Sequence, residues 1–311
     1  MNQMINSADA IPTKIKFDES FFEEEERCNF YVTRKRKELW AILLDLWQEF
    51  DRVCRKYGLK YYLNGGTLLG AVRHKGFIPW DDDFDVMMFR KDYNKLLEIG
   101  ANEFRHPYFF QHGYTDLYYY YAQHIKVRNS ATLAEMYNWL HTKHNHGIFF
   151  DVFALDVLNE DEEKVREQEK ELLMYQQLMD SLINQSKTYV PVTLNVGGKV
   201  RKFENVLHIH RLFEECAQRY ENSPTKMVTE FVLYLKKDSR GTFPIEYLGE
   251  PIYVPFESFS APIPSNSDAI LKINFGDDYM TPKMSATSLH GDIFVDTRHS
   301  YLDIINNLRL V

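Results

Sequence analysis

Cysteine and long apolar runs are both scarce in this chain of 311 residues. The three cysteines, Cys28, Cys54 and Cys216, are an odd number at wide spacing and form no Cys-x-x-Cys pair. We therefore expect free thiols and a reducing compartment. No apolar run approaches the roughly 18–20 residues of a transmembrane helix, and the first residues lack the apolar core of a signal peptide. These absences predict a soluble, cytoplasmic protein.

An excess of positive charge is also missing. The 37 Lys and Arg residues are outnumbered by 45 Asp and Glu residues, which gives a formal net charge of −8 at pH 7. A nucleic-acid partner is not expected, because binding a phosphate backbone requires a basic surface. The sequence shows no internal repeat and no low-complexity linker, which favours one integrated unit. The aromatic share of 15% favours pockets that stack rings.

The segment 61–88 combines a glycine pair with a cluster of acids. A short apolar run ends at Gly65 and Gly66, and we predict a strand, a glycine turn, a helix over Thr67–Val72, a loop and a second strand. The free amides at the helix start and the positive end of its dipole would suit a phosphate. The alternative is an ordinary glycine turn between two elements.

The acids that follow favour a metal. Asp83 and Asp85 are two apart, so on a strand they would share one face while Phe84 and Val86 enter the core. Neighbouring carboxylates repel each other unless a cation lies between them. With oxygen ligands alone, that cation would be Mg²⁺ or Mn²⁺. The alternative is a solvated acidic turn.

Two further segments carry charge in a strand-like setting. Lys126 and Arg128 belong to a predicted strand over 118–127 and would share a face, which suits a clamp on a diphosphate; the alternative is a pair of surface charges. Asp151 interrupts the apolar run 147–156, and a buried carboxylate is costly unless it is paired or bound to a metal. Asp156 is expected to brace the end of that strand.

The helices follow from apolar periodicity and end signals. We predict a helix from Thr33 that ends at Gly58 and packs beside a strand over 60–63. Asp92 and Asn159 are the predicted N-caps of two later helices. A hairpin over 190–200 with Gly197 and Gly198 at its turn, and a helix over 203–220, are expected in the second half.

Three histidines, His141, His144 and His146, have a spacing that can chelate zinc. The sequence places no cysteine or acid in a helpful position beside them. We therefore do not predict a zinc site there.

The residues 65–74 and 76–85 together resemble the signature of the LicD family, which includes the fukutin-related proteins and belongs to the nucleotidyltransferase superfamily. The segment 271–281 resembles the family's C-terminal Tyr-Gly-Asp motif, with Phe275 in place of the tyrosine, and would close over the substrate site. The resemblance implies that the catalytic and metal-binding residues are Asp83, Asp85 and Asp151. It implies donor contacts from Gly65, Gly66, Thr67, Arg73, His74, Lys75, Lys126, Arg128 and His290.

The fold implied is an α/β nucleotidyltransferase-type mixed twisted sheet flanked by helices, with C-terminal helices and short strands packed on it. Residues 1–32 would form an N-terminal arm, 33–158 the catalytic core, and 159–311 a region that completes the substrate site.

The resemblance implies a Mg²⁺- or Mn²⁺-dependent phosphotransferase. It would move a phosphorylated alcohol such as phosphocholine from a CDP-activated donor (CDP-choline-like) onto a glycan or lipid-linked glycan, as in lipopolysaccharide or teichoic acid modification, and release CMP. Two alternatives stay open at this point. One is a nucleotidyltransferase that attacks the α-phosphate of a nucleoside triphosphate and releases pyrophosphate. The other is a non-catalytic binding protein of the same fold.

Overall fold

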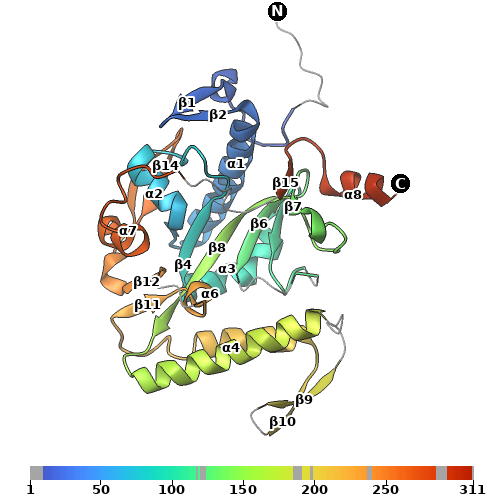
Figure 1. Cartoon of the computed structure of the whole chain (residues 1–311), viewed down its shortest axis with the longest axis vertical. Coiled ribbons are helices and arrows are strands. Elements are labelled where there is room, and N and C mark those ends of the chain that lie inside the picture. The colour runs from blue at the N-terminus through green and yellow to red at the C-terminus, as the bar shows by residue number, and fades with distance from the viewer. Residues whose placement is uncertain are drawn as a thin grey trace, which may run out of the picture.

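The computed structural model describes residues 10–116, 118–119, 124–184, 191–196, 199–236, 240–284 and 293–309. Within these residues the centre of the molecule is a curled seven-stranded mixed sheet with helices around it (Figure 1). Five strands run in the order β12–β11–β8–β4–β3, and β6 joins β8 with β5 beyond it. The predicted fold class, a mixed α/β fold with a twisted sheet flanked by helices, is confirmed.

The long strand β8 (Ile148–Leu158) connects the sheet. One of its edges pairs in parallel with β4 (Asp85–Phe89). The other edge pairs antiparallel with β6 (Ile125–Asn129) along its first half and with β11 (Met227–Thr229) along its last residues. The remaining strands of the sheet are β3 (Tyr62–Leu63), β5 (Tyr108–Gln111) and β12 (Thr242–Pro244).

The register of these strands separates a polar face from an apolar face. Asp85 lies opposite Asp151 on β8, and Asp151 lies opposite Lys126 on β6. Because side chains alternate along a strand, these three residues share one face, which we call the carboxylate face. Val86 and Val152 also pair with each other and are fully buried on the opposite face.

Helix α1 (Arg34–Tyr57) covers part of the apolar face, where it packs on β6 and β8. Its start is capped by Thr33, whose hydroxyl accepts a hydrogen bond from the Arg36 amide, and its end is Gly58 at φ +66°. The predicted helix and its glycine cap are confirmed. The strand expected at 60–63 is shorter and contains only Tyr62 and Leu63.

Helix α3 (Arg90–Glu103) packs on β4 and β8. The predicted N-cap, Asp92, is wrong, because β4 runs directly into the helix and Phe89 occupies the cap position. Asp92 instead lies in the first turn, where its carboxylate accepts from the Lys60 amide at 3.4 Å. An acid in the first turn still suits the positive end of the helix dipole.

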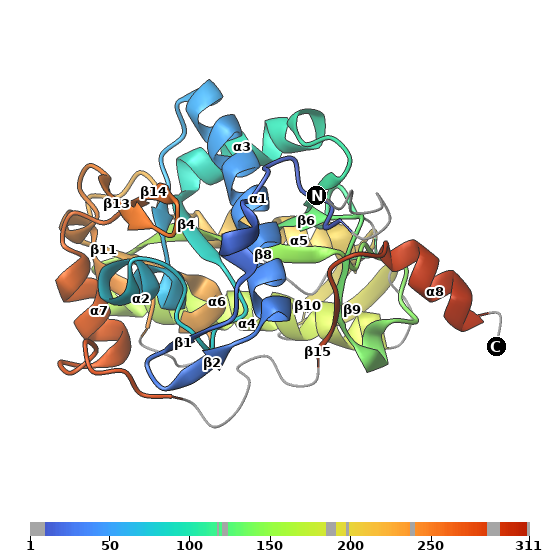
Figure 2. The same cartoon turned by 90° about the horizontal axis from the view of Figure 1, so that it is seen from above.

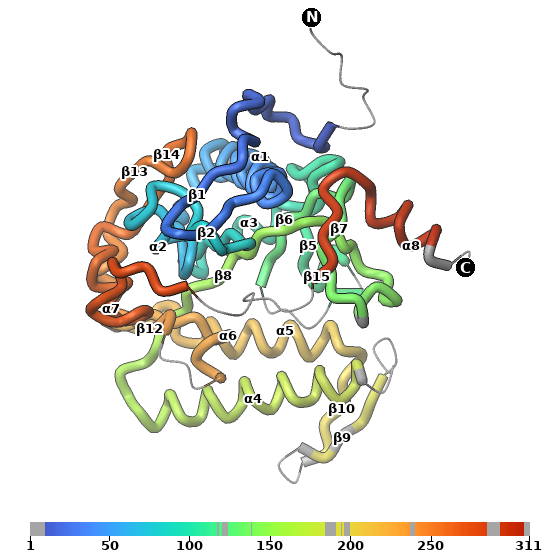
Figure 3. Tube along the Cα trace, turned by 45° about the horizontal axis from the view of Figure 1, so that its top comes forward, coloured from blue at the N-terminus to red at the C-terminus, as the bar shows by residue number. Residues whose placement is uncertain are grey.

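A second apolar cluster is built by α4 (Glu162–Asn184) and α5 (Val206–Ala217), which lie side by side (Figure 3). The cap predicted at Asn159 is wrong, since the carboxylate of Asp161 accepts from the amides of Glu163 and Lys164. The predicted hairpin is confirmed by the pairing of β9 (Val192–Val196) with β10 (Lys199–Phe203). Its expected turn residues, Gly197 and Gly198, lie outside the described residues.

The other elements surround the sheet (Figure 2). They are η1 (Glu19–Phe22), β1 (Glu25–Arg27), β2 (Phe30–Val32), α2 (Gly65–His74), β7 (Leu133–Met136), η2 (Tyr137–Trp139), α6 (Phe231–Tyr234), η3 (Ile245–Tyr247), β13 (Ile252–Phe256), β14 (Phe259–Ile263), α7 (Ser267–Phe275), β15 (Ile293–Asp296) and α8 (Tyr301–Arg309). All three cysteines are free thiols. Among the helices that the structure describes, none has the length and apolarity to cross a bilayer.

The start of α3 and the end of β8 are joined by a buried ion pair. Arg90 donates two hydrogen bonds of 2.7 Å to the carboxylate of Asp156, and both side chains are almost fully buried. The expectation that Asp156 braces the strand end is confirmed.

We predict that Asp156→Ala lowers the free energy of unfolding by about 3–5 kcal/mol, because it leaves the Arg90 charge buried without its main partner. Denaturant unfolding measures the change. The double variant Arg90→Met/Asp156→Leu removes both charges and should recover much of the loss, while Glu98→Ala, in an exposed pair with Lys95, should cost less than about 0.5 kcal/mol. A single variant as stable as the wild type would contradict the assignment.

Candidate active site

The glycine pair lies at the start of α2. The sequence predicted a separate turn before a helix at Thr67, and this boundary is wrong: the helix begins at Gly65, after Asn64 as N-cap. Gly65 has φ +48°, a conformation that favours glycine, and a Cβ on Gly66 would lie 2.7 Å from Asp81 Oδ2. The glycines therefore let the helix start approach the acids closely.

The first two acids belong to different backbone segments. Asp85 is the first residue of β4, and its amide donates to Thr67 Oγ1 at 2.8 Å. Asp83 precedes the strand, so the prediction that both acids lie on it is wrong for Asp83. The predicted burial of Phe84 and Val86 is confirmed, and Asp83 and Asp85 line the same cavity.

Asp85 lies in a strongly negative environment. Burial and the nearby charges of Asp83, Asp151, Asp81 and Glu230 raise its pKa well above the ordinary value. Oxygen ligands placed so close together are the donor set that Mg²⁺ or Mn²⁺ takes in proteins. The residues present therefore fit such a cation, and Asp83 and Asp85 could hold it.

Asp151 has a cationic neighbour, Lys126, and a histidine, His124, beside it instead. Its Oδ1 lies 2.7 Å from Lys126 Nζ and 3.2 Å from His124 Nε2. Burial raises the pKa of Asp151, but the charges and hydrogen bonds of Lys126 and His124 outweigh that effect and hold the pKa well below its usual range. In this arrangement Asp151 is an ionised carboxylate and a weak base.

Lys126 and Arg128 share a strand face, as predicted, but they have different surroundings. Lys126 Nζ lies 3.4 Å and the Arg128 guanidinium 4.5 Å from the centre of the Phe149 ring. Arg128 is 2% exposed and donates to Gln111 and to the Gly147 carbonyl. These contacts place Lys126 beside the carboxylates and hold Arg128 away from them, so donor contact by Arg128 stays a prediction.

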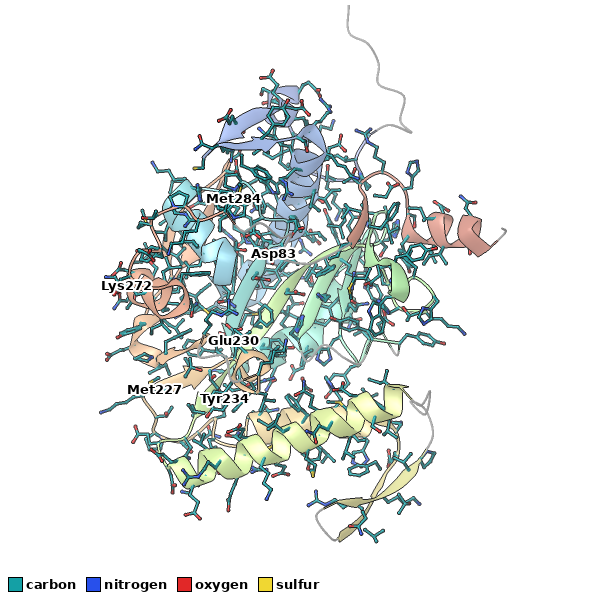
Figure 4. All side chains as sticks on the ribbon, in the orientation of Figure 1. Asp83, Met227, Glu230, Tyr234, Lys272 and Met284 are labelled. Atoms are coloured by element: carbon teal, nitrogen blue, oxygen red, sulfur yellow. The ribbon has the colours of Figure 1, made fainter. Side chains whose placement is uncertain are left out.

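Asp83 and Asp85 line a cavity of about 480 Å³, which we call the main cavity because it contains the acids. From the first half of the chain it is lined by Gly65, Gly66, Arg73, Asp83 and Asp85, among others. The segment 271–281, expected over the substrate site, contributes Phe275, Asp278, Tyr279 and Thr281 to the lining. In Figure 4, Asp83 and Glu230 are labelled at two levels along the sheet face turned to the viewer. A smaller cavity of about 110 Å³ adjoins Asp83, Lys126 and Asp151.

The basic residues at the end of α2 have different surroundings. Arg73 lines the main cavity and donates to the Tyr279 carbonyl at 2.7 Å. Burial and the charge of Arg73 lower the pKa of His74 to about 4. Neither His74 nor Lys75 is among the described residues that line this cavity, so their donor contacts stay predictions. His290, which was also predicted to contact the donor, lies outside the described residues.

The sequence analysis did not identify two residues of the site, Glu230 and His124. Glu230 lines the main cavity, is 2% exposed, and accepts from Asn64 Nδ2 at 2.8 Å. It is an acid inside an apolar segment, the same signal that identified Asp151. His124 lies two residues before Lys126, on the same strand alternation, and that spacing was the available signal for it.

Comparisons with known proteins agree on the family that this chain resembles. Residues 58–169 match the family model "LicD/FKTN/FKRP, nucleotidyltransferase domain". A segment of 72 residues is 43% identical to lipopolysaccharide cholinephosphotransferase LicD of Haemophilus influenzae, covering 23% of this chain and 27% of that protein. A segment of 46 residues is 51% identical to human ribitol 5-phosphate transferase FKRP, covering 15% of this chain and 9% of that protein. An uncharacterised protein of Rickettsia prowazekii is 41% identical over 76 residues, which are 24% of this chain and 26% of that protein.

The fold and the acid-lined site define a nucleotidyltransferase-type domain. Residues 58–169 are similar to the LicD/FKTN/FKRP nucleotidyltransferase domain, and the resemblance inferred from the sequence is confirmed over that segment. The matched segments span about a quarter or less of the length of these relatives.

We predict that Asp85→Asn stabilises the metal-free protein at neutral pH by about 1–3 kcal/mol, since it removes an uncompensated buried charge. Because the folded-state pKa of Asp85 is raised, the folded state binds more protons than the unfolded state, and stability falls as the pH rises above about 4. The lowered pKa of Asp151 has the opposite effect on stability, but only below about pH 4.

Thermal unfolding with a chelator between about pH 5 and 8 measures this effect. The Asp85→Asn curve should be flatter than the wild-type curve. The matched control is Asp18→Asn, at an exposed position whose side chain makes no cap bond, and it should leave the slope unchanged. Parallel curves for wild type and Asp85→Asn would contradict the prediction.

Proposed function

We propose that this chain transfers a phosphorylated alcohol from a CDP-activated donor to a glycan hydroxyl and releases CMP. The observation that carries the proposal is the row Asp85–Asp151–Lys126 across three strands, with Asp83 beside it at the wall of the main cavity. The printed names of two relatives, a cholinephosphotransferase and a ribitol 5-phosphate transferase, support a phosphotransferase.

The donor diphosphate is placed at the start of α2. The helix amides after Gly65 and Gly66 and the helix dipole attract the phosphates, and Arg73 adds a positive charge to the same cavity. A divalent cation held by Asp83 and Asp85, with Asp151 as a third ligand, would neutralise the diphosphate and polarise the transferred phosphoryl group. Lys126 supplies a further positive charge beside Asp151, where negative charge develops on the phosphoryl oxygens.

Asp151 acts as a ligand more readily than as a base. Lys126 and His124 hold its pKa well below the usual range, and a general base is most effective with a pKa near the working pH. An ionised carboxylate with a low pKa is instead suited to a cation.

The alcohol end of the donor lies among aromatic rings. Trp80, Phe153, Phe275 and Tyr279 line the main cavity together with the acids Glu230 and Asp278. Aromatic faces and negative charges attract a quaternary ammonium group. This lining supports phosphocholine over an uncharged polyol phosphate.

We predict that wild-type protein incubated with Mg²⁺, a lipid-linked glycan acceptor and CDP-choline releases CMP faster than with CDP-ethanolamine, CDP-glycerol or CDP-ribitol. Asp83→Asn should slow release by about 100-fold or more, the scale of losing one charge-stabilising group, and Asp18→Asn should not. The released nucleotide is identified by chromatography. Pyrophosphate from a nucleoside triphosphate, without CMP from any CDP-alcohol, would support nucleotidyl transfer instead.

We predict that Asp151→Asn weakens Mg²⁺ binding and turnover together and that raising Mg²⁺ recovers part of the rate, as expected for a ligand. Calorimetric titrations of Mg²⁺ and donor, with turnover measured in parallel, test this. Unchanged affinities with turnover lowered by about 100-fold or more would assign Asp151 as a base. Wild-type turnover in the variant would contradict both roles.

A further inference from the structure

An acid and two histidines meet where the chain enters β8. Glu135 lies on β7, and its Oε2 is 2.9 Å from His144 Nε2 and 3.0 Å from His146 Nδ1. The two imidazoles are almost fully buried, and Glu135 is largely so. The sequence analysis placed no acid beside these histidines and was wrong, because the Ala134 amide bonds to the His146 carbonyl and brings Glu135 alongside.

The outer ring nitrogens also have partners. His146 Nε2 lies 3.2 Å from the carbonyl oxygen of Thr142. His144 Nδ1 lies 2.9 Å from the hydroxyl of Thr142, which itself donates to the Trp139 carbonyl at 2.7 Å. We call Glu135, His144 and His146 the Glu-His-His cluster.

The number of protons in this cluster does not match its contacts. A carbonyl and an ionised carboxylate only accept hydrogen bonds, and a neutral imidazole carries one N–H. His146 faces an acceptor at both nitrogens. His144 faces Glu135 at Nε2 and the Thr142 hydroxyl at Nδ1, and that hydroxyl can donate either to Nδ1 or to the Trp139 carbonyl. Neutral rings therefore leave one contact, at His146, without a donor.

One extra proton on a ring would supply this donor, but it would place an imidazolium charge in a buried site. The His144 and His146 rings are 4.1 Å apart between centroids, so two imidazolium ions would also repel each other. Burial lowers the pKa of His144, and the charge of Arg128 adds to this. Burial raises the pKa of Glu135, but hydrogen bonds from both histidines and the charge of Arg128 outweigh it and keep the carboxylate ionised.

We propose that the Glu-His-His cluster binds a divalent transition metal, Zn²⁺ by its donor set, through Glu135 Oε2, His144 Nε2 and His146 Nδ1. Every contact then has its proton: each ring donates its outer N–H to Thr142, and the Thr142 hydroxyl donates to Trp139. Imidazole nitrogens and a carboxylate are common zinc ligands, and zinc-bound histidines usually donate their other N–H to such acceptors. Three protein ligands leave a fourth position for water.

This site is separate from the acids of the main cavity. His146 precedes Asp151 by five positions in the sequence, a distance of roughly 16 Å along an extended strand. A metal here would join β7 to the loop that leads into β8, the strand that carries Asp151. Its role would be structural support of the active site, independent of phosphoryl transfer.

A second group with similar residue types, His112, His210 and Glu214, does not have this pattern. The Tyr114 amide donates to His112 Nδ1 at 3.4 Å, so the ring proton is on Nε2, which faces Glu214 Oε1 at 3.4 Å. A metal at Nε2 would require the proton on the nitrogen that already accepts. The Arg90 guanidinium is also only 4.0 Å from Glu214.

The test is metal loading of the full chain. After removal of metals with a chelator, the protein is incubated with Zn²⁺ or Co²⁺ in excess Mg²⁺, desalted, and its metal content is measured by mass spectrometry. We expect about one retained equivalent of Zn²⁺, a tetrahedral Co²⁺ absorption spectrum, and a higher melting temperature with Zn²⁺. Failure of the wild-type protein to retain either metal would overturn the proposal without any variant.

Substitutions of single residues test which side chains bind the metal. Glu135→Gln and His144→Asn should each lower Zn²⁺ affinity by about 100-fold or more, because each removes a ligand and the loss of an orienting partner alone costs about 10–100-fold. His141→Asn, at an exposed position of the same loop, and Asp83→Asn should retain about one equivalent. His144→Cys keeps a zinc ligand and should restore binding with a thiolate–Co²⁺ band. Full retention by both Glu135→Gln and His144→Asn, or loss in Asp83→Asn, would overturn the assignment.

Discussion

Repulsion between buried carboxylates is the constraint on which the site depends. Asp85 pairs in register with Asp151, Asp83 lies just before the same strand, and the carboxylate of Asp81 lies against the glycine start of α2. The opposite face of the sheet is apolar and fully buried, so these strands cannot turn the acids toward another environment. The folded protein therefore holds negative charges together at a cost, and that cost favours a bound cation.

Lys126 and His124 relieve this repulsion at Asp151 only. The charge of Lys126 and the hydrogen bonds of both residues lower the pKa of Asp151, while the pKa of Asp85 stays raised. The neighbouring carboxylates thus differ in character, although both lie on one face. Such a division is typical of sites where environment assigns roles to chemically identical groups.

Local patterns predicted much of this arrangement. Alternation around Asp85 and Asp151 indicated buried strands with outward acids, and Gly58 marked the end of α1, because both signals depend on near neighbours in sequence. The helix start at Gly65 was missed, since it depends on how closely the acids approach. Arg128 and Glu230 could not be placed either: their partners, Gln111 and Asn64, are distant in sequence.

The Glu-His-His cluster shows the same limit. Spacing identified the histidines, but only the β7–β8 junction brings Glu135 beside them, and only the folded loop turns the carbonyl and hydroxyl of Thr142 toward their outer nitrogens. Proton counting requires those partners, so the sequence alone gave no reason to predict a metal there.

The central claim is that Asp83, Asp85 and Asp151 hold a cation at the donor diphosphate. A crystal structure with Mn²⁺ and CDP-choline tests it most directly, through the anomalous signal of manganese. The account predicts a peak in contact with the carboxylates of Asp83 and Asp85 and with the diphosphate, beside the start of α2. Manganese bound elsewhere, with the diphosphate away from Gly65 and Gly66, would contradict it.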